Sequence, residues 1–201
     1  MIVVIGSLIG RLDDAGDVHP GGFVATLATS AASDGASVQV VARVGDDAAG
    51  DAVLLGLAAA GVGHVAALRD ASRGTPVTSP ADDNPAEDGE RTLPPGPPLD
   101  AADVNLALRY LSDYRVIVVA HAPDAGVLAE AVSASSWAGA HLVVVSTAKT
   151  TSAVTMPDAG LVLSADPEAD AVAARLGRYA AAVDAGSDPD TAYAVLTGAT
   201  T

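Results

Sequence analysis

Short β-branched runs alternate with longer stretches of small residues along the chain, and this alternation limits the fold more than any other feature. Ile2–Ile5 is an unbroken β-branched run that ends at Gly6, and Val116–Ala120 reads VIVVA. Such continuous apolar runs are typical of strands that are buried on both faces. Strands that alternate with helices form a parallel sheet covered by helices. The sequence therefore predicts a three-layer αβα domain with a mostly parallel central sheet.

Cap and breaker signals set the expected bounds of the other elements. Asp46 or Asp47 can cap a helix that stops at Gly61, and Asp100 or Asp103 can cap another. A glycine at 177 predicts a break in the last helix. Further strands are expected at 37–44, 142–145, 161–163 and 193–196, and helices at 23–33, 48–60, 100–111, 124–137 and 167–185.

The segment 65–98 departs from the alternation. It is short, polar and rich in proline and glycine, with strand-sized pieces at 65–68, 75–79 and 90–93. A helix-poor excursion within an alternating chain predicts a small β lid. The expected organisation is one α/β domain over residues 1–201, with 65–98 as the lid.

Charge and composition exclude several classes of protein. The chain has 25 acidic and 10 basic side chains, a net charge of -15 and no cysteine. The charge argues against a nucleic-acid binder with a basic face, and the lack of cysteine excludes disulfides and thiolate metal sites. No apolar run approaches the roughly 20 residues that a membrane helix needs. We expect a cytoplasmic protein that binds neither nucleic acid nor membrane.

Several short motifs follow one another in a fixed order over essentially the whole chain. They are IVVIGSLIG, HPGG, ARVGDDAAGDAVLLGLAAAGV, TPVT, DGERT, GPPLDAADV, ADPEADAVAARLG and TAYAVLTGA. The most specific part is the pair Gly21-Gly22 followed by the run GDDAAGD at 45–51. In this order the motifs resemble the ribokinase-like (PfkB) carbohydrate kinase family. The resemblance implies a ribokinase-like fold in which a lid closes over a sugar site.

The resemblance also implies where a ligand would lie. In the family the glycine pair sits beside the sugar, and the absence of a Cβ allows the backbone to approach a ligand closely. An ordinary strand-to-helix turn is the alternative reading of the pair. The expected ligand site is the crevice at the carboxyl ends of the strands. Its expected substrate-binding residues are Arg11, Gly21, Gly22, Thr26, His121 and Asp124.

The sequence departs from the family pattern at these positions. Arg11 stands where the family usually has a sugar-binding Asp, and Thr26 stands where it usually has an Asn. The family's Asn and Glu of the phosphate and metal region match only loosely, to Asp166 and Glu168. No Gly-Ala-Gly-Asp motif occurs, so the resemblance implies a short, divergent member without the nucleotide region and the catalytic base. The sequence assigns no catalytic residue and no metal ligand.

The leading hypothesis is a catalytically inactive homologue that binds a small molecule beside Gly21-Gly22. An arginine at position 11 favours an anionic or phosphorylated ligand. The second hypothesis is an active sugar or nucleoside kinase, with ATP and Mg²⁺ as cofactors and a divergent or partner-completed site. The third is an interaction protein that forms a homodimer through exposed lid strands.

Overall fold

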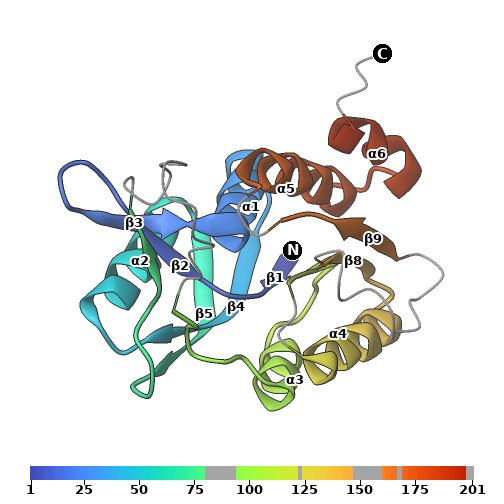
Figure 1. Cartoon of the computed structure of the whole chain (residues 1–201). Helices are drawn as coiled ribbons and strands as arrows, with labels where there is room; N and C mark the ends of the chain where they lie inside the picture. The colour runs from blue at the N-terminus through green and yellow to red at the C-terminus, as the bar shows by residue number, and fades with distance from the viewer. Residues whose placement is uncertain (80–93, 122–123, 147–159, 167–168, 198–201) are drawn as a thin grey trace.

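Six parallel strands form the central sheet of the computed structural model, in the order β5-β4-β1-β7-β8-β9 (Figure 1). The structure describes residues 1–79, 94–121, 124–146, 160–166 and 169–197. Every neighbouring pair in this sheet is parallel, which confirms the predicted architecture. The strands are β1 (Ile2–Ile5), β4 (Val38–Gly45), β5 (Val62–Asp70), β7 (Val116–Ala120), β8 (His141–Ser146) and β9 (Leu161–Ser164).

Helices cover both faces of this sheet (Figure 1). Helices α1, α2, α5 and α6 contribute buried side chains to one face, and α3 and α4 contribute them to the other. Asp100 caps α3 through a reciprocal capping box with Asp103, and Asp124 caps α4. The helices are α1 (Gly22–Ser33), α2 (Ala48–Ala59), α3 (Ala101–Tyr110), α4 (Ala125–Ala138), α5 (Asp170–Asp184) and α6 (Pro189–Thr197).

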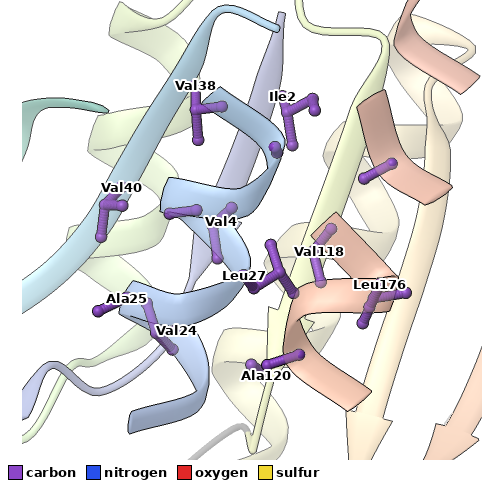
Figure 2. Close-up of a cluster of buried hydrophobic side chains, with 14 of the residues drawn as sticks. Ile2, Val4, Val24, Ala25, Leu27, Val38, Val40, Val118, Ala120 and Leu176 are labelled. Atoms are coloured by element: carbon purple, nitrogen blue, oxygen red, sulfur yellow. The ribbon is translucent and has the colours of Figure 1, made fainter. Parts of the chain in front are cut away.

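Alternation along each strand divides the core into two layers. In β1, Ile2 and Val4 belong to the layer under α1 and α5, whereas Val3 and Ile5 belong to the layer under α3 and α4. Figure 2 shows the first layer, where Val4 and Val118 of the sheet lie close to Leu27 and Leu176 of the helices. Strands β1 and β7 are buried on both faces and are accordingly apolar at every position.

A second, three-stranded sheet lies beside the central one and is built differently from the predicted lid. Its order is β3-β2-β6, with β2 (Ile9–Leu12) antiparallel to β3 (Val18–Gly21) and parallel to β6 (Val77–Thr78). Residues 9–21 therefore supply most of this lid sheet. Pro20, which has no N–H to donate, lies in the edge strand β3.

Of the described strands within 65–98, the expected lid, only β6 belongs to the small sheet. The strand expected at 65–68 is part of β5, which pairs with β4 in the central sheet. The expected strand at 90–93 lies outside the described residues.

Two predictions near the C-terminus are wrong. Residues 193–196, expected as a strand, belong to helix α6, whose first-turn N–H groups donate hydrogen bonds to the Asp188 carboxylate. Ala192 and Leu196, four residues apart, are buried, which is helical spacing. Helix α5 continues through Gly177 without a break. A Cβ at Gly177 would lie 2.4 Å from the carbonyl oxygen of Leu27, so this glycine allows α5 to approach α1.

None of the helices in the described ranges combines the length and the hydropathy that crossing a lipid bilayer demands.

Candidate functional site

The predicted site lies where the lid sheet meets the carboxyl ends of the central strands. Strand β1 leads into β2 of the lid, and β3 returns to α1 through the glycine pair. Gly21 is the last residue of β3. Gly22 opens α1 with φ +74°, a backbone conformation that residues other than glycine rarely adopt. The backbone conformation of this turn is therefore sufficient by itself to require glycine at position 22.

Side chains of the lid fill the room that the glycine pair leaves. A Cβ at Gly21 would lie 2.9 Å from the Cβ of Arg11, and a Cβ at Gly22 would lie 2.8 Å from Cδ1 of Ile9. Both glycines are buried. The pair therefore allows strand β2 to pack closely on the start of α1, which agrees with the strand-to-helix reading of the motif.

Three polar side chains from distant parts of the chain meet beside this turn, and we call them the polar cluster. Arg11 Nη2 of β2 donates to Oδ2 of Asp170 at 2.9 Å. The Thr26 hydroxyl of α1 donates to Oδ1 of the same carboxylate at 3.2 Å. Asp170 is the first residue of α5, where a negative charge is favoured by the helix dipole. Its carboxylate joins the lid to α1, and the formal charges of Arg11 and Asp170 cancel.

His121 lies near the cluster, but its hydrogen bond connects the ends of two strands. Its ring packs edge-on against Phe23 of α1, with 5.0 Å between centroids. Its Nε2 lies 2.9 Å from the carbonyl oxygen of Ala165, just past β9. Because a carbonyl only accepts, Nε2 carries the proton in this contact. His121 therefore fastens the end of β7 to the end of β9.

Asp124 is engaged in helix capping. Its Oδ1 accepts from the backbone N–H of Val127 at 2.9 Å, and no described contact links it to the polar cluster. Of the six predicted residues, the structure brings together Arg11, Gly21, Gly22 and Thr26. It places His121 next to them through Phe23.

The GDDAAGD motif at the same edge of the sheet is a structural joint. Asp47 accepts hydrogen bonds from Gly50 N at 2.7 Å, Thr75 N at 2.7 Å and the Thr75 hydroxyl at 2.9 Å. Burial raises the pKa of Asp47, but these hydrogen bonds and the nearby Arg69 outweigh it and lower the pKa overall. Asp47, not Asp46, is the N-cap of α2. The motif thus ties the end of β4 to α2 and to the segment before β6.

A second arginine at this edge is bound by several carboxylates. Arg43 of β4 donates to both oxygens of Asp103, at 2.7 and 2.9 Å, and to Asp70 at 3.0 Å. The Asp103 hydrogen bonds raise the pKa of Arg43 despite its burial. Hydrogen bonds from Ser72 chiefly, and from Arg43, lower the pKa of Asp70. These contacts hold β4, β5 and α3 together.

Two hollows lined by described residues lie away from the polar cluster. A groove of about 850 Å³ runs between α3 and α4, with Arg109, Glu130 and the exposed Trp137 among its lining residues. A shallower hollow of about 560 Å³ lies at the start of β5. Neither contains a predicted site residue. Within the described ranges, no group of His, Asp or Glu side chains is arranged to hold a metal ion.

Asp170 is the site residue that the sequence reasoning missed. The family match directed attention to Asp166 and Glu168, and Glu168 lies outside the described residues. The available signal was an acidic residue in the first turn of a helix that follows a parallel strand. Such a residue lies at the same edge of the sheet as the glycine pair. Its partners, 144 and 159 positions earlier, could not be identified from spacing.

Solved structures with a similar fold include sugar kinases of the ribokinase type. A putative Ribokinase II from E. coli, solved without ligand and with ATP and Mg²⁺, has a TM-score of 0.65 and 0.66 at 14% identity; the alignment covers 95% of this chain and 88% of that one. Fructokinase from Xylella fastidiosa has a TM-score of 0.56 at 17% identity, with 98% and 69% covered.

An uncharacterized sugar kinase from Pyrococcus horikoshii has a TM-score of 0.54 at 15% identity over 72% of this chain. This chain spans about half, 52%, of that kinase. The sequence matches no protein-family model and no curated protein. The ribokinase-like fold that the motifs implied is therefore confirmed by structure.

Proposed function

We propose that this ribokinase-like protein binds a small, hydroxyl-bearing molecule at the polar cluster and does not itself transfer phosphate. The observation that supports binding is the meeting of Arg11, Thr26 and Asp170 at one point beneath the lid sheet. Together they offer guanidinium N–H donors, a hydroxyl and carboxylate acceptors, which suits a ligand whose hydroxyls both donate and accept. In open α/β sheets, ligands bind outside the carboxyl ends of the strands, where this cluster lies.

Three carboxylates at this edge are already engaged by the chain, which supports the absence of phosphate transfer. A catalytic base needs a carboxylate whose acceptor atoms can reach a substrate hydroxyl. Asp47, Asp103 and Asp124 are held in caps or ion pairs. The 201 residues also contain no Gly-Ala-Gly-Asp motif.

The test of binding is titration with a panel of polyols and sugars that includes ribitol and D-ribose. We expect saturable binding, with shifts at the backbone amides of Gly21 and Gly22 in two-dimensional NMR spectra. Thr26→Val keeps the side-chain shape but removes the hydroxyl. It should weaken binding by up to about tenfold, because the Thr26 oxygen can no longer accept from a ligand hydroxyl, and a neutral hydrogen bond contributes about 0.5–1.5 kcal/mol.

Thr29→Val is the matched control for this experiment. Thr29 lies one turn further along α1, and its hydroxyl donates to the carbonyl oxygens of Ala25 and Thr26, with no described contact to the side chains of the cluster. Equal losses in the two variants would place the ligand elsewhere, and an absence of saturation across the panel would contradict the proposed function.

An active kinase is the second candidate, supported by the E. coli structure that contains ATP and Mg²⁺. That protein is similar in fold over 95% of this chain. The two candidates predict different results in isothermal titration with ATP and MgCl₂. We expect no binding below millimolar concentration, because the net charge of -15 repels a polyanion. Micromolar affinity, together with ADP formation when a sugar is added, would establish the kinase instead.

A further inference from the structure

We propose that Asp170 determines the ligand class at the polar cluster, so that the cluster accepts neutral polyols and rejects anions. The inference rests on the proposed function and names the ligand class for that site. It differs from the expectation drawn from position 11 alone, where an arginine favours an anionic or phosphorylated ligand. In the folded chain that arginine already has an anion beside it.

Both oxygens of the Asp170 carboxylate are engaged by the chain itself. Oδ2 accepts from Arg11 and Oδ1 accepts from Thr26, at 2.9 and 3.2 Å. The Asp170 side chain is 35% exposed and the Arg11 side chain 51% exposed, so both groups still face solvent. A guanidinium has five N–H donors, and this ion pair uses one of them in the described contacts.

These contacts treat neutral and charged ligands differently. A polyol hydroxyl can accept from the remaining N–H groups of Arg11 while it donates to a lone pair of Asp170. A deprotonated phosphate oxygen can only accept, and within reach of Arg11 it also lies within a few ångströms of the Asp170 charge. Repulsion at such a distance weakens anion binding by about tenfold near a solvated surface. The acidic chain adds to this repulsion.

Asp170→Asn tests the role of the charge, because it keeps the shape and one acceptor. Inorganic phosphate and ribose 5-phosphate serve as probes for the variant and for the unmodified chain. Backbone amide shifts at Gly21, Gly22 and Thr26 are followed at constant ionic strength. We expect the variant to bind both anions about tenfold more tightly than the unmodified chain.

Two further variants separate the local charge from other effects. Asp34→Asn removes the same charge from an exposed residue at the opposite end of α1 from the glycine pair, and should leave anion affinity unchanged. Arg11→Gln combined with Asp170→Asn should abolish the gain, since no guanidinium remains. Thermal melts of each variant confirm folding.

The outcomes distinguish this inference from the proposed function. Equal anion affinity in Asp170→Asn and Asp34→Asn, or a gain that survives the loss of Arg11, would overturn the role of Asp170. Polyol binding to the unmodified chain in that case would leave the proposed function standing. A gain in anion affinity without any polyol binding would support the role of Asp170 and contradict the proposed function.

Discussion

Replacement of Gly177 by valine is expected to destabilise the fold by about 3 kcal/mol, the upper part of the range for overpacked cores. A Cβ at this position meets the carbonyl oxygen of Leu27 at 2.4 Å and the backbone N of Ala31 at 3.0 Å. These are backbone atoms of α1, so a rotamer change cannot relieve the contact. Native domains are stable by about 5–15 kcal/mol, so this loss is a large fraction of the total. The measurement is urea denaturation followed by circular dichroism.

The alanine variant tests whether a side chain at position 177 raises or lowers the free energy of unfolding. Helix propensity alone predicts that Gly177→Ala stabilises α5 by about 1 kcal/mol. The contact with α1 predicts destabilisation, and we expect the contact to dominate. Arg178→Val is the control for the valine variant, because Arg178 is the next residue of α5 and is exposed. A denaturation midpoint that rises in Gly177→Ala would mean that α1 and α5 are further apart than in this structure.

Asp47→Ala is expected to cost about 3 kcal/mol of the free energy of unfolding. The substitution removes the N-cap of α2, which is worth about 1 kcal/mol. It also leaves the Thr75 N–H and hydroxyl without their charged acceptor, and hydrogen bonds to charged groups contribute more than neutral ones. The thermal midpoint and the urea midpoint should both fall.

The contribution of Asp47 should depend on pH in a defined direction. Despite burial, its hydrogen bonds keep its pKa in the folded protein below the ordinary value for an aspartate. A lowered pKa means that the stabilisation is fully present above the pKa of the unfolded chain and is lost as the pH falls through the folded pKa. The difference between Asp47→Ala and the unmodified chain should therefore be larger at pH 7 than at pH 3.

Asp46→Ala is the neighbouring control for both measurements. Asp46 is exposed and its ion pair with Arg69 spans 3.6 Å, so its loss should cost less than 1 kcal/mol. Equal losses in the two variants, or a difference that does not shrink in acid, would contradict the role of Asp47 as the joint between β4, α2 and Thr75.

Local patterns in the sequence predicted the strands and helices that bury one continuous face or both faces. The run Ile2–Ile5 is strand β1, Val116–Ala120 is β7, and helices α1 to α4 lie where caps and apolar spacing placed them. Asp100 and Asp124 cap as expected. These predictions succeed because a helix cap and an apolar repeat depend only on residues that are close together in the sequence.

The errors fall where a segment depends on a distant partner. Strands β2 and β3 contain Gly10 and Pro20, so neither has a strong strand pattern of its own, and they pair with each other and with β6. Residues 193–196 form a short apolar run, whose period does not distinguish a strand from a helix. Gly177 has the appearance of a helix breaker until α1 is placed against it.

The sequence by itself determined the parallel αβα architecture, because burial on both faces demands unbroken apolar strands whatever their order. It also pointed to Arg11, Thr26 and the glycine pair as neighbours of a ligand. The tertiary structure alone decided what surrounds them: Ile9 and Arg11 occupy the room beside the glycines, and Asp170 pairs with Arg11. The reason is that the net charge of a site depends on side chains from elements that only folding brings together, here β2, α1 and α5.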